Sequence, residues 1–179
     1  MKILVATEKP FAKKAVDGIR QIVEGAGYEL ALLEKYTDKS ELLSAVADVD
    51  ALIIRSDKVT AEVIEAARNL KIVVRAGAGY DNVDLAAATA RGIVVMNTPG
   101  QNSNAVAELA LAMMIFMARN GFTPGTGSEI QGKTLGIHAY GNVGRLVGRK
   151  GKAMGMNVIA YDPFITDSAV FEADGVKKV

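Results

Sequence analysis

The sequence predicts an α/β protein with two units, each built around a parallel β-sheet. Through about the first hundred residues, short β-branched runs alternate with helical patterns, so that strands and helices take turns. The runs are continuously apolar rather than alternating, which suits a parallel sheet that helices bury on both faces. A Gly-rich stretch follows, and a second series of strand, helix and strand begins after it.

Five strands and four helices are expected in the first unit. The strands are expected at Ile3–Val5, Glu29–Leu33, Leu52–Ile54, Ile72–Val74 and Ile93–Val95. The helices are expected at Phe11–Glu24, Lys39–Ala47, Ala61–Ala67 and Leu85–Ala90. Glycines stand where several of these helices end, which is the usual punctuation of a helix C-terminus.

A long apolar helix, from about Asn102 to Arg119, opens the second unit. Ala, Leu and Met surround it on nearly all sides, so we expect it to be buried between layers or subunits. Residues 120–128 hold three Gly and one Pro and are expected to form a linker, with the second sheet starting after it. Its elements are expected at Thr134–Tyr140 (strand), Asn142–Met154 (helix), Asn157–Asp162 (strand) and Val176–Val179 (the beginning of a third strand). We assign residues 1–98 to the first domain and residues 99–179 to the second.

Composition excludes several classes of function. Lys and Arg number 21 against 20 Asp and Glu, and the charges are interspersed, so neither a nucleic acid nor an anionic membrane is an expected partner. There is no Cys and only one His, which excludes disulfides, thiolate catalysis and the usual zinc sites. The longest apolar run, Leu109–Ala118, is about half of the roughly 20 residues that span a membrane. We therefore expect a soluble cytoplasmic protein without a metal site.

The main chemical signal is a Gly-rich turn between a strand and a helix. Residues 139–144 match the dinucleotide fingerprint, with Ala139 in place of its first Gly. The residues predicted to contact a cofactor at the turn are Tyr140, Gly141, Asn142, Val143 and Gly144. The methyl group of Ala139 is expected to strain the turn or to loosen binding. A Gly cluster alone marks only a tight turn, and the order strand, turn, helix, strand is what favours a dinucleotide.

The turn residues have separate physical roles. Gly141 lets the backbone approach a pyrophosphate, and Gly144 lets the helix pack closely on the strand. The N–H groups that follow Gly141 face the anion at the positive end of the helix, where Arg145 can add charge. The next strand ends in Asp162, 18 residues after Gly144, near the position of the acid that binds the adenosine ribose. Because a carboxylate repels a 2′-phosphate, NAD is favoured over NADP.

A longer pattern resembles the D-2-hydroxyacid dehydrogenase family, in register from Met1 to Val179. The matching stretches are Arg75–Asp84, Ala90–Ile93, Asn97–Pro99, Asn102–Leu109 and Leu135–Gly144. Two further pairs, Arg55-Ser56 and Asp162-Pro163, resemble the phosphoglycerate dehydrogenase branch of that family.

The resemblance implies a flavodoxin-like parallel-sheet substrate domain without its C-terminal helix, followed by an incomplete Rossmann NAD-binding domain. It implies NAD-dependent oxidation of 3-phosphoglycerate to 3-phosphohydroxypyruvate, the first step of serine synthesis. Arg55 and Ser56 match residues that hold the substrate phosphate, and the backbone at Gly77 and Ala78 matches the loop that receives the carboxylate. The positions that match substrate contacts are Arg55, Ser56, Arg75, Gly77, Ala78 and Asn102. From the residues alone, the arginines could equally be solvated strand ends and Asn102 a helix N-cap.

The family's catalytic Arg, acid and His fall in the part of the pattern that comes after Val179. No catalytic residue is therefore expected here, and the chain is expected to be a fragment that is inactive alone. The only His, His138, precedes the Gly-rich turn, where a side chain more often packs into the sheet than faces a nicotinamide.

Alternatives remain within and outside the family. The chain could be a fragment of a glyoxylate or hydroxypyruvate reductase, or a non-enzymatic nucleotide-binding or assembly module. A flavodoxin or response-regulator function for residues 1–98 has less support, because Thr7–Pro10 supplies neither a phosphate-binding loop nor an acidic pocket. A homodimer is expected, because the apolar helix and the open sheet edge need cover.

Overall fold

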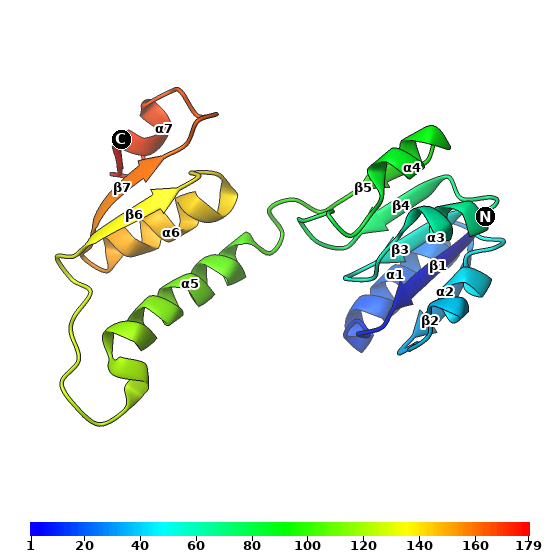
Figure 1. Cartoon of the computed structure of the whole chain (residues 1–179), viewed down its shortest axis with the longest axis horizontal. Helices are drawn as coiled ribbons and strands as arrows, with labels where there is room; N and C mark the ends of the chain where they lie inside the picture. The colour runs from blue at the N-terminus through cyan, green and yellow to red at the C-terminus, as the bar shows by residue number, and fades with distance from the viewer. The chain divides into compact units, whose positions relative to one another are not determined.

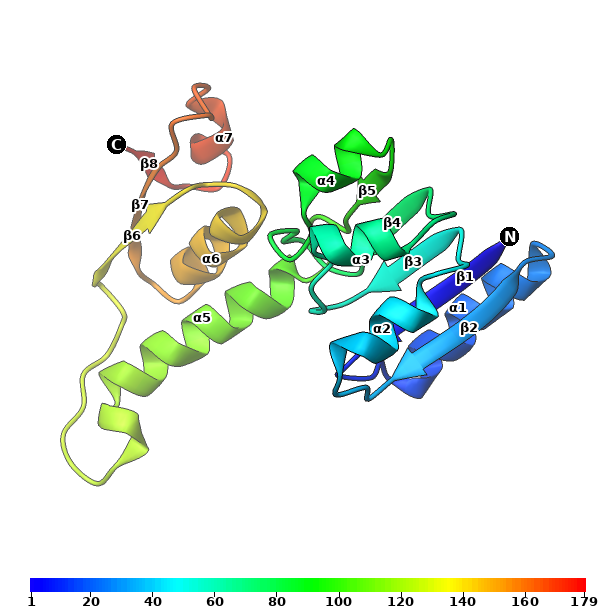
Figure 2. The same cartoon turned by 45° about the vertical axis from the view of Figure 1, so that its right-hand side comes forward.

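The computed structural model describes residues 1–179 as two compact units, Met1–Pro99 and Gly100–Val179. Each unit has its own parallel sheet, as Figures 1 and 2 show. The prediction of an α/β fold built on parallel sheets is confirmed. The Gly-rich segment 120–128 was expected to be a linker ahead of the second sheet. It lies inside the second unit, because the long helix before it packs on α6 of the same unit.

The first unit is a five-stranded sheet in the order β2-β1-β3-β4-β5, with every neighbouring pair parallel. The strands are β1 (Lys2–Thr7), β2 (Glu29–Glu34), β3 (Ala51–Ile54), β4 (Ile72–Arg75) and β5 (Val94–Met96). The helices are α1 (Lys13–Gly25), α2 (Lys39–Ala45), α3 (Ala61–Ala66) and α4 (Leu85–Ala90). This strand order is that of flavodoxin-like sheets, in which ligands bind beyond the carboxyl ends of the strands.

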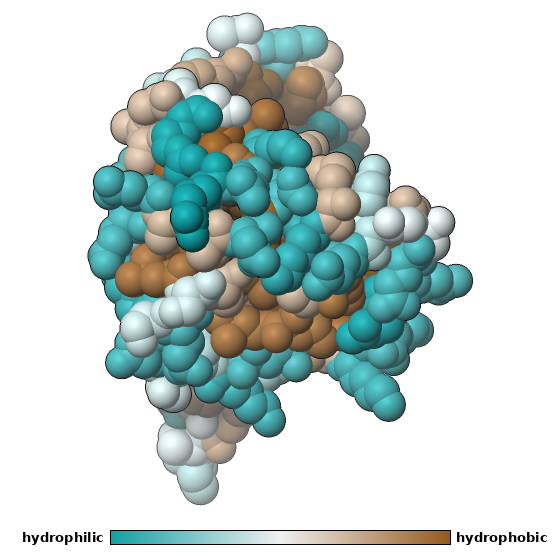
Figure 3. Space-filling view, turned by 90° about the vertical axis from the view of Figure 1, so that its right-hand side faces the viewer, coloured by the Kyte–Doolittle hydropathy of each residue, from teal (hydrophilic) through white to brown (hydrophobic).

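The core of the first unit follows from the apolar strands. Leu4, Leu52, Ile54 and Val73 on the three central strands are almost fully buried, because helices cover both faces there. Apolar side chains stay exposed on the edge strands β2 and β5. Figure 3 shows patches of apolar surface framed by hydrophilic residues.

The second unit is a three-stranded parallel sheet in the order β6-β7-β8, which leaves β6 at a free edge. Its elements are α5 (Ser103–Ala118), the 3-10 turn η1 (Asn120–Phe122), β6 (Thr134–His138), α6 (Asn142–Ala153), β7 (Asn157–Tyr161), α7 (Ala169–Glu172) and β8 (Lys177–Lys178). The order matches one half of a Rossmann sheet. Strand β6 ends at His138 rather than Tyr140, because Ala139 adopts a left-handed conformation with φ +79°. The short α7 and η1 were not expected from the sequence.

A second core forms around Tyr140 beneath this sheet. Its ring is fully buried and stacks on Phe171, with ring centroids 4.7 Å apart. Its hydroxyl donates to the buried carboxylate of Asp174, which also pairs with the Nε atoms of Arg145 and Arg149 at 3.1 and 2.6 Å. Burial favours the protonated form of Asp174, but these three donors outweigh it and lower the pKa of Asp174.

The long helix α5 packs along α6 but is not buried within a single chain. Only Ser103, Ala107 and Leu111 are buried, whereas Leu109 and Met117 are 61% and 72% exposed. The expectation of burial between layers is therefore wrong for one chain. No helix in the structure combines the length and the hydropathy needed to cross a membrane.

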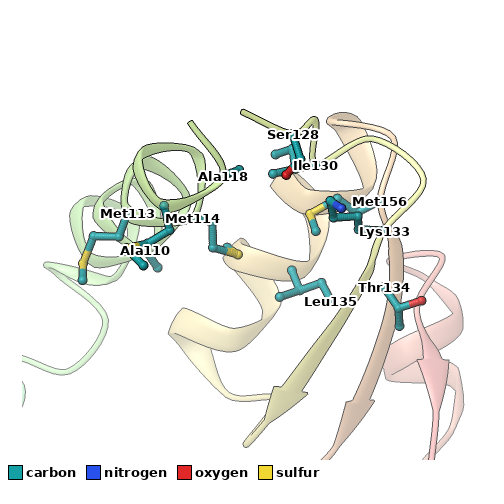
Figure 4. Close-up of a pocket in the computed structure, with 11 residues that line it drawn as sticks. Ala110, Met113, Met114, Ala118, Ser128, Ile130, Lys133, Thr134, Leu135 and Met156 are labelled. Carbon is teal, nitrogen blue, oxygen red and sulfur yellow. The ribbon is translucent and has the colours of Figure 1, made fainter. Parts of the chain in front are cut away.

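An apolar hollow of about 720 Å³ lies between α5 and the free edge of β6. Figure 4 shows Met113 and Met114 of α5 on one side of it, and Leu135 and Met156 on the other. It holds few polar groups that could orient a ligand. The Gly-rich turn and the carboxyl edge of the first sheet are therefore better candidates for the functional site.

Candidate nucleotide and substrate sites

The Gly-rich turn places free backbone donors at the start of α6. Gly141 is the N-cap residue, and the first helical bond runs from the N–H of Arg145 to its carbonyl oxygen at 2.9 Å. The N–H groups of Asn142 and Val143 have no acceptor within the chain. A Cβ atom built on Gly141 would meet nothing within 4 Å, so the space beside this N-cap residue is open. This arrangement fits an anion such as a pyrophosphate.

Gly144 and two later glycines allow α6 to lie close to the sheet. A Cβ atom on Gly144 would stand 2.2 Å from the carbonyl oxygen of Ala139, which is a clash with backbone. On Gly148 and Gly151, Cβ atoms would come within 2.9 Å of the Tyr140 hydroxyl and of Leu135, respectively. Gly144 is therefore required by packing, whereas Gly141 is not.

Asp162 follows β7 and ties its end to the Gly-rich turn. Asp162 is 8% exposed, and its carboxylate accepts hydrogen bonds from the N–H groups of Tyr140 at 2.7 Å, Phe164 at 2.8 Å and Ile165 at 3.3 Å. The bond from Phe164 is the main cause of the lowered pKa of Asp162. A carboxylate accepts about four hydrogen bonds, so roughly one lone pair remains for a hydroxyl group.

Two residues predicted at the turn have contacts that their local sequence did not indicate. Tyr140 was predicted to contact a cofactor; its side chain is buried in the second core, and only its backbone belongs to the turn. Arg145 was expected to add charge to an anion, and its Nε atom pairs with Asp174. The partners Phe171 and Asp174 lie too far along the chain for a local pattern to reveal them.

In the first unit, the predicted substrate residues lie at the carboxyl ends of neighbouring strands. Arg55 and Ser56 follow β3 directly and are exposed. Arg75 ends β4 opposite Ile54, and the N–H of Ala76 donates to the Ile54 carbonyl oxygen at 2.8 Å. The sheet therefore brings the loops after β3 and β4 side by side, at the edge where parallel sheets bind ligands.

The loop after β4 holds an arginine with an unsatisfied donor. The Nε atom of Arg75 is buried without a hydrogen-bond partner, and its guanidinium covers Gly77 so closely that a Cβ atom there would lie 1.4 Å from Nη1. The N–H of Gly77 donates to the Arg75 carbonyl oxygen at 2.8 Å, whereas the N–H of Ala78 has no acceptor. Such a loop suits an anionic ligand, because a guanidinium and free N–H groups both prefer carboxylate or phosphate oxygens.

Two other residues singled out in the sequence, Asn102 and His138, lie in the second unit. Asn102 is the N-cap of α5 in the second unit, but its side chain makes no capping hydrogen bond. His138 is exposed on β6 and stacks on Tyr161, with ring centroids 5.7 Å apart, so it does not pack into the core. Asn97 was not predicted as a site residue, yet its side chain donates to the Ala78 carbonyl oxygen at 2.7 Å and so fixes the loop after β4.

Residues 4–174 match the family model described as D-isomer specific 2-hydroxyacid dehydrogenase, catalytic domain. The chain belongs to this family. A crystal structure of NAD⁺-bound 3-phosphoglycerate dehydrogenase from Entamoeba histolytica is 51% identical, with a TM-score of 0.90 over 96% of this chain and 59% of that one. The predicted family and its α/β fold are thus confirmed.

Curated members of the D-2-hydroxyacid dehydrogenase family show the same relationship. D-3-phosphoglycerate dehydrogenase of Archaeoglobus fulgidus is 42% identical over 100% of this chain and 35% of its own length. Hydroxypyruvate reductase of Thermotoga maritima is 43% identical over 75% of this chain and 49% of its own length. The chain therefore spans between about a third and a half of these relatives.

Replacing Ala139 by Gly should stabilise the second unit by up to about 1 kcal/mol. Gly removes the left-handed strain of about 1–2 kcal/mol, and part of that gain is offset by the greater freedom of the unfolded chain. Urea unfolding measures the difference. Ala153→Gly makes the same change at an exposed helical position of α6 and should destabilise the unit instead. Equal destabilisation by both variants would contradict a strained turn.

Proposed function

We propose that this chain contributes the substrate and NAD sites of an NAD-dependent D-2-hydroxyacid dehydrogenase that oxidises 3-phosphoglycerate to 3-phosphohydroxypyruvate, the first step of serine synthesis. The first unit would bind the substrate and the second unit the cofactor. The observation that carries the proposal is the start of α6, where the N–H groups of Asn142 and Val143 have no acceptor and the space beside Gly141 is open. Asp162 is held at the same turn by the Tyr140 N–H. The names of relatives from Entamoeba histolytica and Archaeoglobus fulgidus support the choice of substrate.

At the cofactor site, the N–H groups of Asn142 and Val143 would hold the pyrophosphate, and the free lone pair of Asp162 would accept a ribose hydroxyl. The negative charge of Asp162 disfavours a 2′-phosphate, so NAD is preferred over NADP. The chemistry that a bound NAD⁺ would supply is a hydride acceptor for the substrate's hydroxyl-bearing carbon.

At the substrate site, the guanidinium of Arg55 and the hydroxyl of Ser56 would hold the phosphate group. The Ala78 N–H, which has no acceptor, and the guanidinium group of Arg75 would receive the carboxylate. The Gly77 N–H is engaged by the Arg75 carbonyl oxygen, so its part in binding requires that this bond open. The substrate contact of Asn102 stays a prediction, because Asn102 belongs to the second unit.

Turnover also needs a base for the hydroxyl proton. We assign that role to no residue of these 179, because His138 is engaged in stacking on Tyr161 and no other group near the turn suits it. The proposal for the chain alone is therefore binding of both ligands without catalysis.

Two alternatives remain in view. The Thermotoga maritima relative favours a hydroxypyruvate or glyoxylate reductase. The pair Arg55-Ser56 favours a phosphorylated substrate instead. A non-enzymatic assembly module is favoured by the exposed apolar face of α5. The titration below separates the last alternative from both dehydrogenase functions.

NADH titrated into the purified chain should show saturable binding by its fluorescence, and NADPH should bind more weakly. Gly141→Ala should weaken NADH binding by roughly tenfold, about 1.4 kcal/mol, because the methyl group enters the space before α6. The variant should keep its fold, since Gly141 has φ −79° and no neighbour within 4 Å of the added atom.

Gly18→Ala is the matched control, because it adds a methyl group to equally open space on α1. Asp162→Ala is less informative alone, since it also removes the bond that holds the Tyr140 N–H. If wild-type protein fails to bind NADH, the assembly module becomes the better hypothesis.

We further propose a homodimer that covers the exposed side chains of α5. Met117→Lys should shift the protein toward monomer in sedimentation at micromolar concentration, because a charge would enter the apolar interface. Ile22→Lys changes an equally exposed residue on α1 and should leave the dimer intact. A wild-type monomer at that concentration rules the dimer out.

A further inference from the structure

A buried carboxylate lies next to the residues proposed to hold the substrate phosphate. Asp57 follows Arg55 and Ser56 in the loop after β3, yet it is only 3% exposed, whereas Arg55 and Ser56 are open to solvent. No lysine or arginine pairs with it. A buried carboxylate without a cation must be stabilised by neutral hydrogen-bond donors, so its hydrogen bonds indicate which segments it holds together.

The hydrogen bonds of Asp57 join the loops after the four strands β1 to β4. Oδ1 accepts from the Glu8 N–H after β1 and from the Tyr36 hydroxyl after β2, both at 2.8 Å. Oδ2 accepts from the N–H of Arg55 at 3.2 Å. The backbone oxygen of Asp57 accepts from the side chain of Asn82, after β4, at 2.7 Å.

We propose that Asp57 is a positioning residue, which fixes the Arg55–Ser56 turn so that the guanidinium and the hydroxyl present one preformed anion site. This inference rests on the proposed function for its ligand, a phosphorylated hydroxy acid. Asp57 touches no ligand itself. It acts through the backbone of Arg55, and it anchors that backbone to the ends of β1, β2 and β4.

The chemistry of the two carboxylate oxygens makes the role testable. In Asp57→Asn, the amide oxygen can keep both the Glu8 N–H and the Tyr36 hydroxyl, but the amide NH₂ then faces the N–H of Arg55, donor against donor. The variant therefore removes the bond to Arg55 selectively. Tyr36→Phe removes a bond from Oδ1 and leaves the bond to Arg55 intact, so it is the matched control.

The experiment combines amide hydrogen exchange with binding of 3-phosphoglycerate, both on the full 179-residue chain. Asp57→Asn should speed exchange of the Arg55 amide and weaken 3-phosphoglycerate binding, each by roughly tenfold, as loss of a hydrogen bond to a charged group implies. Tyr36→Phe should lower the unfolding temperature about as much as Asp57→Asn does. It should change the Arg55 exchange rate and the 3-phosphoglycerate affinity by less than about twofold.

The outcomes separate this inference from the proposed function. If both variants change Arg55 exchange equally, Asp57 has only a structural role and the inference is overturned. If wild-type protein does not bind 3-phosphoglycerate, the proposed substrate is wrong. The role of Asp57 in positioning a phosphate site is then also wrong, even if Asp57→Asn speeds exchange at Arg55 as expected. If Asp57→Asn, but not Tyr36→Phe, loses both the exchange protection of the Arg55 amide and 3-phosphoglycerate binding, the result supports the positioning role of Asp57 and the proposed substrate.

Discussion

In each unit, a buried carboxylate at the carboxyl edge of the parallel sheet holds the loops on which the proposed site depends. Asp57 joins the loops after four strands of the first unit, and Asp162 joins β7 to the turn after β6 in the second. Parallel strands end at one edge and leave backbone N–H groups there without ladder partners. A carboxylate satisfies several of them at once, and the remaining donors stay free for an anionic ligand.

The second unit places its donors by close packing against a strained turn. Gly144 lets α6 approach the carbonyl oxygen of Ala139, while Ala139 itself takes a left-handed conformation that favours glycine. The buried pair of Tyr140 and Phe171, with the ion pairs of Asp174, fixes the helix from below. The same contacts that stabilise this small sheet therefore aim the N–H groups of Asn142 and Val143.

Much of the fold and part of the site could be predicted from local patterns. The apolar runs located every strand to within a few residues, and the spacing from Gly144 to Asp162 placed an acid beside the Gly-rich turn. Long-range contacts could not be read in this way: Asp57 meets Glu8 across 49 residues, and Arg145 meets Asp174 across 29. The exposure of α5 could not be predicted either, because an apolar helix has the same sequence pattern whether its own chain or a second chain covers it.

The function proposed for the second unit requires that an anion bind at the carboxyl edge of its sheet, on the donors that Asp162 and α6 hold in place. Amide NMR spectra of the labelled chain, recorded with and without NAD⁺, locate the bound anion. We expect chemical-shift changes to concentrate at Asn142, Val143 and the residues around Asp162. Changes confined to the apolar hollow lined by Met113, Met114 and Leu135, or no changes at all, would show that the anion site is not at this turn.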